Sequence, residues 1–144
     1  MPIERRERSL ARIVDQIGAA ISPPLLDPRI WTALWGVALS ATSVLYLLPN
    51  AGPPGHMQLD KVAHLIAFGV IGLCSFMGAG RRRLSLPMLL SLMMAVLLEW
   101  LQGFVPGRQY SLIDCGANLA GSCAGFAAGV VVRAWTARQP RPSA

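Results

Sequence analysis

Charged side chains are scarce in this chain, and acidic ones are the scarcest. Only 14% of its 144 residues are charged, 7 of them are Asp or Glu, and 53% are hydrophobic. A soluble domain of this length carries about a quarter charged residues. The low charge and a mean hydropathy of +0.48 exclude an ordinary soluble domain and indicate an integral membrane protein.

Cysteine is also scarce, and the three present exclude a disulfide framework. Cys74 and Cys123 fall inside apolar runs, where cysteine acts as a small buried hydrophobe. The formal net charge of +6 does not predict a nucleic-acid partner, because the arginines are divided among separate short segments.

Four apolar runs are long enough to cross a bilayer, which takes about 20 residues. They cover residues 30–48, 61–79, 84–105 and 112–134. The short connections predict that successive helices are antiparallel. Most basic residues gather beside one set of run ends, in residues 5–29, 81–83 and 133–141. Cytoplasmic loops are rich in Lys and Arg, so we predict both termini in the cytoplasm.

The predicted fold is therefore an all-α four-transmembrane-helix bundle in the bacterial cytoplasmic (inner) membrane. Apolar residues in 3–21 recur at helical spacing, which predicts an N-terminal amphipathic helix lying on the membrane surface. A loosely ordered or partner-binding segment is the alternative there. The predicted organisation is a cytoplasmic segment (1–29), a membrane domain (30–135) and a disordered tail (136–144).

The remaining polar residues gather at the opposite ends of the runs, which we predict to face outward. Three runs each carry a polar pair spaced for one helix face: Asp60 with His64, Glu99 with Gln102, and Asp114 with Asn118. Lys61 and Arg108 lie at the rim. Ionised side chains in a membrane cost about 3 kcal/mol or more and usually mark function. The sequence thus predicts one outward-facing polar site built from three helices.

The order of these residues resembles the VanZ-like family of small bacterial membrane proteins over about residues 55–132. The motifs are Asp60-Lys61-x-x-His64, then Glu99-x-x-Gln102-x-x-x-Pro106-Gly107-Arg108, then Ser111-x-x-Asp114-x-x-x-Asn118-x-x-Gly121-x-x-x-Gly125. The resemblance implies a cell-envelope protein, linked through one family member to resistance to the glycopeptide teicoplanin. It implies no particular reaction, and whether the chain is an enzyme stays open.

From these residues we expect a site that binds or acts on a lipid-linked or cell-envelope anionic group, such as a polyprenyl-linked or cell-wall precursor headgroup. The expected acid–base residues are Glu99, His64, Asp60 and Asp114. The expected substrate-binding residues are Arg108, Lys61, Gln102, Ser111 and Asn118. The alternative is a non-enzymatic structural or partner module in which the cluster is interhelical glue. A proton path is disfavoured, because the other halves of the runs lack ionisable residues.

Each of these residues also has a structural interpretation. His64 could hold helices together, Glu99 could pair with Arg108 or Lys61, and Asp114 could cap the last helix. Arg108 could anchor to lipid headgroups, and Asn118 could form an interhelical hydrogen bond. No cofactor is predicted; a divalent metal is a minor alternative, because one histidine with carboxylates is an unselective ligand set.

The last run also carries Gly121, Gly125 and Gly129 at intervals of four. Glycines at this spacing let a neighbouring helix approach closely. They could serve the internal bundle or a homodimer, and an envelope protein is a further candidate partner beside the surrounding membrane lipids.

Overall fold

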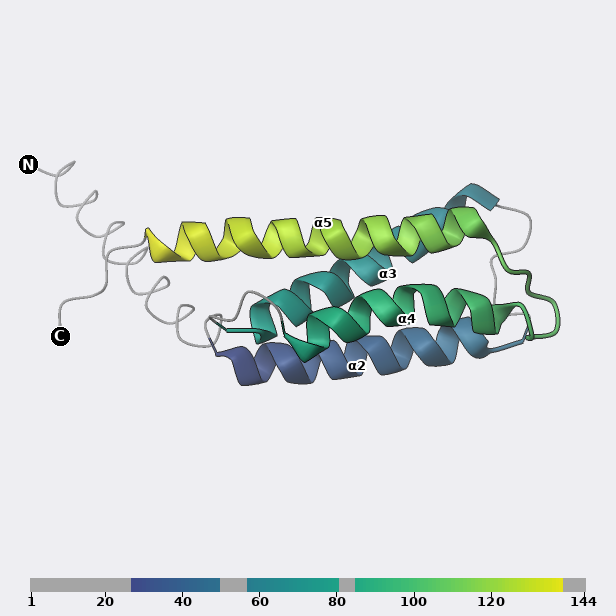
Figure 1. Cartoon of the computed structure of the whole chain (residues 1–144), viewed down its shortest axis with the longest axis horizontal. Coiled ribbons are helices and arrows are strands. Elements are labelled where there is room, and N and C mark those ends of the chain that lie inside the picture. The colour runs from purple at the N-terminus through teal and green to yellow at the C-terminus, as the bar shows by residue number, and fades with distance from the viewer. Residues whose placement is uncertain (1–26, 50–56, 81–84, 139–144) are drawn as a thin grey trace, which may run out of the picture.

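The computed structural model describes residues 27–49, 57–80 and 85–138. These residues form four helices: α2 (Pro28–Leu47), α3 (Met57–Gly78), α4 (Leu86–Gln102) and α5 (Leu112–Ala137). Figure 1 shows them running in alternate directions along the long axis of the bundle, with α3 crossing the others obliquely. The antiparallel order is as predicted. The predicted surface helix at 3–21 lies outside the described residues.

Three of the four predicted spans are confirmed as helices long and apolar enough to cross a membrane: α2, α3 and α5. The fourth, α4, is apolar but has only 17 residues, shorter than the predicted 84–105. Its start is set by Pro87 in the first turn, where a missing N–H costs nothing. At its other end the helix gives way to a turn at Gly103, and the chain turns again at Gly107, whose φ is 81°.

Two helices begin at side-chain caps. Asp27 accepts a hydrogen bond from the Arg29 N–H at 2.8 Å to start α2. Ser111 accepts one from the Asp114 N–H at 3.3 Å to start α5. Such caps satisfy amide groups that have no partner within the helix.

The closest packing in the bundle is the seam between α3 and α5, and glycines make it possible. A Cβ on Gly121 would collide with the Leu65 carbonyl, and one on Gly125 would collide with the backbone of Gly69 and Leu73. A Cβ on Gly129 would collide with the Phe76 ring. The predicted close approach is therefore made inside the bundle, against α3.

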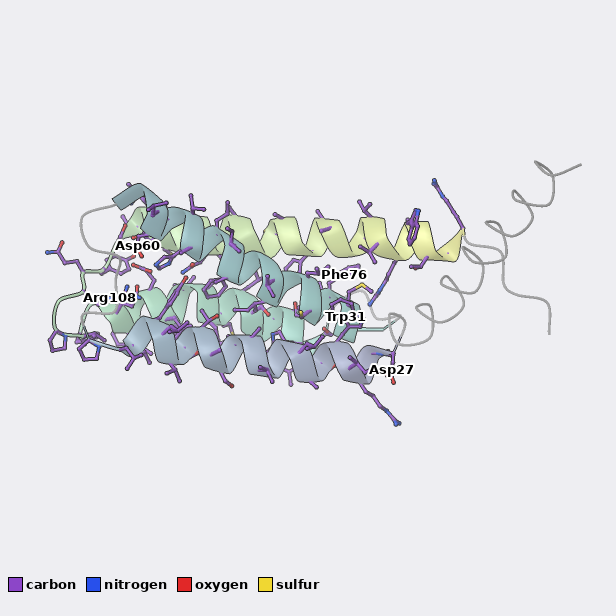
Figure 2. The ribbon with its side chains drawn as sticks, turned by 180° about the vertical axis from the view of Figure 1, so that it is seen from behind. Asp27, Trp31, Asp60, Phe76 and Arg108 are labelled. Atoms are coloured by element: carbon purple, nitrogen blue, oxygen red, sulfur yellow. The ribbon has the colours of Figure 1, made fainter. Side chains whose placement is uncertain are left out.

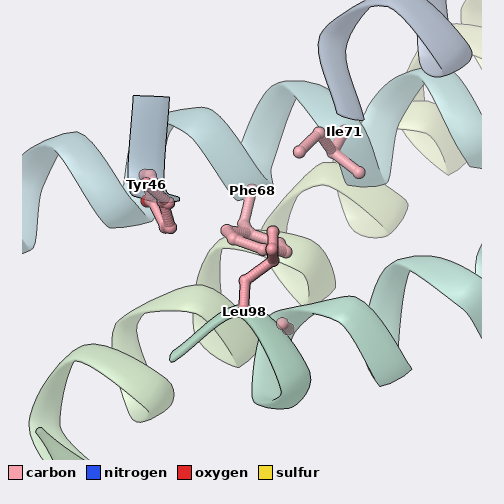
Figure 3. Packing of buried hydrophobic residues seen from close by; sticks show 5 residues of the cluster. Tyr46, Phe68, Ile71 and Leu98 are labelled. Carbon is pink, nitrogen blue, oxygen red and sulfur yellow. The ribbon is translucent and has the colours of Figure 1, made fainter. Parts of the chain in front are cut away.

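The hydrophobic core lies beside this seam and joins α2, α3 and α4. It consists of Tyr46, Phe68, Ile71, Ala95 and Leu98. Figure 3 shows Phe68 in the middle of the group, with Tyr46 and Ile71 on either side. Outside the core, large apolar side chains such as Val37 (68% exposed) and Leu86 (67%) face outward. Such an outer surface fits lipid as its surroundings.

Candidate functional site

The polar residues predicted from three separate runs meet at one end of the bundle. Figure 2 places Asp60 and Arg108 at this end, with Asp27, Trp31 and Phe76 towards the other. The site is built from α3, the end of α4, the α4–α5 connection and the start of α5. We call this group the polar end; it comprises Asp60, Lys61, His64, Glu99, Gln102, Arg108, Ser111, Asp114 and Asn118.

His64 is at the centre of the polar end and is 1% exposed. Its Nδ1 lies 3.1 Å from Asn118 Oδ1 and 3.6 Å from Glu99 Oε2. Its Nε2 lies 3.7 Å from Asp60 Oδ1, which is too long for a hydrogen bond. One imidazole thus faces side chains from α4, α5 and its own helix.

Asn118 fixes the state of that imidazole. Its Nδ2 donates a hydrogen bond to the Ala95 carbonyl at 3.0 Å, so its Oδ1 is the atom that faces His64. An amide oxygen only accepts, and His64 Nδ1 must therefore carry the proton. The interhelical hydrogen bonds foreseen for Asn118 are present, reaching both α3 and α4.

Glu99 is completely buried, and its two oxygens have different surroundings. Oε1 accepts a hydrogen bond from the Ser111 N–H at 3.0 Å, whereas Oε2 has no hydrogen-bond partner. Within the described part of the chain no ion pair joins Glu99 to Arg108 or Lys61; its one charged-group contact is His64. One oxygen of the Glu99 carboxylate is therefore held by a backbone hydrogen bond, and the other could still accept one.

Asp114 does not cap α5, because the adjacent Ser111 hydroxyl already does so. Asp114 lies in the first turn, and its Oδ1 is 3.4 Å from Lys61 Nζ. The side chains of Asp60 and Lys61 are 32% and 33% exposed, against 10% for Asp114. These three residues form the mouth of the site, with His64 behind them.

Two predicted substrate-binding residues are engaged with the end of α2. Gln102 Nε2 donates to the Tyr46 carbonyl at 3.1 Å, and Arg108 Nη2 donates to the Leu45 carbonyl at 3.2 Å. Both carbonyls belong to the last turn of a helix, where intrahelical donors are missing. Gln102 and Arg108 therefore hold α2 against the polar end.

One residue of the site was missed by the sequence analysis. Tyr46 of α2 lies over His64 with ring centroids 4.3 Å apart, and its buried hydroxyl has no hydrogen-bond partner. The available signal was its position in the last turn of the first run, on the side where the polar pairs lie.

A family model of the Rhomboid domain matches residues 63–135, about half of the chain. The chain belongs to the Rhomboid domain family. This is a family of membrane proteases. No curated protein and no solved structure matches the chain.

The Rhomboid match overturns the resemblance to the VanZ-like family and what it implied. The link to teicoplanin resistance and the action on a lipid-linked or envelope anionic group are wrong, and nothing favours the structural-module alternative. The resemblance depended on short polar motifs at helix ends, which describe the site more than the family. The Rhomboid match instead extends from α3 through α5 and includes the glycine seam.

The polar end does not contain a histidine paired with a hydroxyl or thiol nucleophile. Within the described residues, the ring nitrogens of His64 face only Asn118, Glu99 and Asp60. Ser122 is fully buried one turn beyond Asn118, and its hydroxyl has no hydrogen-bond partner. The groups that contact one another here are the Asp60, Glu99 and Asp114 carboxylates, the His64 imidazole and the Lys61 ammonium.

Proposed function

We propose that this Rhomboid-family chain is an intramembrane protease-like hydrolase whose reacting groups lie at the polar end. The observation that supports it is the complete burial of His64, Glu99 and Asn118, at 1%, 0% and 0% exposure, in a bundle with an apolar outer surface. Ionisable groups inside membrane helices are costly and are retained mainly where they serve function. The family supplies the reaction class, hydrolysis of a peptide bond in a membrane protein.

The geometry favours water as the direct nucleophile. Asp60 has 32% of its side chain exposed and lies 3.7 Å from His64 Nε2, and Asp114, 10% exposed, lies 3.4 Å from Lys61 Nζ. A carboxylate there would take a proton from water as its oxygen attacks the peptide carbonyl carbon. The proton would then pass to the amide nitrogen as the C–N bond breaks, which leaves a carboxylate and an amine.

Lys61 has the best position to stabilise the oxyanion formed in this reaction. Its ammonium lies 3.4 Å from Asp114 and one third of its side chain is exposed. A fixed positive charge near the developing oxyanion lowers the barrier. Glu99 and Asn118 hold the imidazole, and we assign them a positioning role.

We further propose that the polar end faces outward from the cytoplasmic membrane. Among the described residues, Arg29 lies at the start of α2, and Arg133 and Arg138 at the end of α5. These ends lie opposite the polar end (Figure 1), and basic residues mark the cytoplasmic side. A cysteine at Gln109 in cysteine-free protein should react with an impermeant thiol reagent on intact cells, whereas one at Ala137 should not; the reverse pattern would contradict this orientation.

The hydrolase proposal is tested with purified protein in liposomes that also contain a panel of end-labelled single-span membrane proteins. Wild type should cleave a member of the panel. Asp114→Asn and His64→Gln should lower the rate by about 100-fold or more, the usual size of an acid–base contribution. Asp27→Asn makes the same chemical change at the opposite end, keeps a good helix cap, and should cleave normally.

The same assay distinguishes water from a serine nucleophile. Ser122→Ala and Ser75→Ala each remove a fully buried hydroxyl, and Ser75 donates its own to the Gly72 carbonyl. Both variants should cleave at the wild-type rate. Loss of cleavage in Ser122→Ala alone would replace the water route by a covalent one, and cleavage that survives in an Asp60→Asn/Asp114→Asn double variant would overturn the proposal.

A further inference from the structure

Three side chains at the mouth of the polar end have the composition of a metal site. Asp60 and His64 of α3 and Asp114 of α5 each place one ligand atom within 4.8 Å of the others. Imidazole nitrogen and carboxylate oxygen both bind zinc, at about 2.0–2.2 Å. Two ligands of one zinc ion can therefore be at most about 4.4 Å apart, so small rotations of the two carboxylates would bring the set into range.

The orientation of His64 prepares one nitrogen for a metal. Its Nδ1–H is committed to Asn118 Oδ1 at 3.1 Å, and the amide is held in turn by the Ala95 carbonyl. In the neutral ring Nε2 then presents its lone pair towards Asp60 Oδ1, 3.7 Å away. A lone pair and a carboxylate oxygen repel each other, and a cation between them would turn that repulsion into two bonds.

Buried oxygens without hydrogen bonds give independent support. Glu99 Oε2 is fully buried, has no hydrogen-bond partner and points at the His64 ring from 3.6 Å. Asp114 Oδ1 also accepts no hydrogen bond, and its charged contact is Lys61 Nζ at 3.4 Å. A carboxylate beside the outer nitrogen of a metal-bound histidine is a common arrangement, because it strengthens the histidine as a ligand.

The charge at the polar end also favours a cation. Three carboxylates, from Asp60, Glu99 and Asp114, meet there. Among the described residues, the ion pair that these carboxylates make with a lysine or arginine is that of Asp114 with Lys61 at 3.4 Å, while the Arg108 guanidinium donates to a backbone carbonyl. Acidic charge is therefore in excess, and Lys61 is the competitor that a metal must displace from Asp114.

We infer that Asp60, His64 Nε2 and Asp114 bind one divalent transition-metal ion of the zinc class, with Asn118 and Glu99 as outer partners of His64. Binding of the ion goes beyond the proposed hydrolysis and does not depend on it. Where hydrolysis also holds, the ion would polarise the attacking water.

The test uses the full chain purified in detergent, stripped with a chelator and titrated with Zn²⁺. Bound zinc is counted by elemental analysis, and the rise in the thermal unfolding midpoint is followed. One ion per chain should bind to wild type and to Asp27→Asn. Asp60→Asn and Asp114→Asn should bind at least about tenfold more weakly, and Asn118→Leu, which frees the imidazole, about 10–100-fold more weakly.

Two further samples exclude misleading outcomes. A chain with Cys74, Cys115 and Cys123 all replaced by Ala should keep its zinc; loss there would assign the ion to thiols and overturn the inference. Asp60 is partly exposed, so Asp60→Asn should fold even if Asp114→Asn does not. Equal zinc affinity in wild type and Asp60→Asn, or no bound zinc in wild type, would also overturn it.

The outcomes also separate this inference from the proposed function. Zinc binding without any cleavage would support the metal site and contradict the proposed hydrolase function. Cleavage by protein that binds no zinc, at a rate unchanged by chelators, would support the hydrolase function and contradict the metal site.

Discussion

The two ends of the bundle treat buried polar groups in opposite ways. Among the described residues, four buried atoms in or beside the polar end have no hydrogen-bond partner: Tyr46 Oη, Glu99 Oε2, Arg108 Nε and Asp114 Oδ1, the last of which is ion-paired with Lys61. In the opposite half Arg133 donates to the Phe76 and Met77 carbonyls, and Trp35 Nε1 donates to Ser91 Oγ at 2.9 Å. Among the described residues outside the polar end, the buried hydroxyls without a hydrogen-bond partner are Ser85 Oγ at the start of α4 and Ser122 Oγ in the middle of α5.

This difference distinguishes polar groups that stabilise the fold from polar groups that we assign to function. Arg133 sits over the Phe76 ring, 4.4 Å from its centroid, and binds the carbonyls at the end of α3. Cations at a helix C-terminus are stabilising, so this arginine serves the fold. A buried polar atom without a hydrogen bond costs about 1–3 kcal/mol, and the polar end is therefore less stable than a site with all its hydrogen bonds made.

The largest effect on stability is expected in the seam that supports both ends. In Gly125→Leu the new side chain would collide with the backbone of Gly69 and Leu73. Backbone cannot yield as a flexible side chain does, and the loss should reach about 3 kcal/mol or more. Gly116→Ala is the control, because a Cβ there meets nothing within 4 Å; unfolding in detergent should show it unchanged or about 1 kcal/mol more stable. Equal unfolding midpoints for Gly125→Leu and Gly116→Ala would contradict the close packing of α3 against α5.

A smaller loss of stability is expected from a substitution at the end of the bundle opposite the polar end. Arg133→Met removes hydrogen bonds from a charged group to two carbonyls and should lower the free energy of unfolding by about 1.5–3 kcal/mol. Zinc affinity and the cleavage rate of the folded fraction should not change. Arg138→Met, in the exposed turn after α5, is the matched control and should be nearly neutral. A loss of cleavage in Arg133→Met that exceeds its loss of folded protein would erase the distinction between the two ends.

The smallest effects give the sharpest comparison, because two variants that each remove one buried hydroxyl should differ in sign. Ser91→Ala leaves the indole N–H of Trp35 without its hydrogen-bond acceptor and should lower the free energy of unfolding by about 1–3 kcal/mol. Tyr46→Phe removes an oxygen that has no partner and should raise stability by about 1 kcal/mol. Chemical denaturation of both variants in one detergent measures the pair. Destabilisation of similar size in both would mean that the Tyr46 hydroxyl is satisfied.

Much of the architecture was predictable from the sequence, because membrane helices follow simple rules of length and polarity. Three spans and the convergence of Asp60, His64, Glu99, Asp114 and Asn118 came from apolar run length and helical spacing. The early end of α4 was not predictable, because residues 103–105 continue the apolar run while the chain turns at Gly103. The capping role of Ser111 was missed because both Ser111 and Asp114 are good cap residues.

The finer contacts of the site depend on tertiary structure. Nothing in the sequence shows that Tyr46 from α2 covers His64, or that Gln102 and Arg108 bind the α2 carbonyls instead of facing the mouth. The family assignment failed for a related reason. Short polar motifs at helix ends do not define a family, whereas the match to the Rhomboid domain covers the stretch 63–135.

The most direct test of the account is the cleavage rate of a single-span membrane protein in liposomes by Asp114→Asn beside Asp27→Asn. Each variant exchanges one carboxylate for an amide, at opposite ends of the same bundle. The account predicts that Asp114→Asn loses about 100-fold or more in rate while Asp27→Asn matches wild type. Equal rates in the two variants would contradict the claim that the polar end is the reacting site.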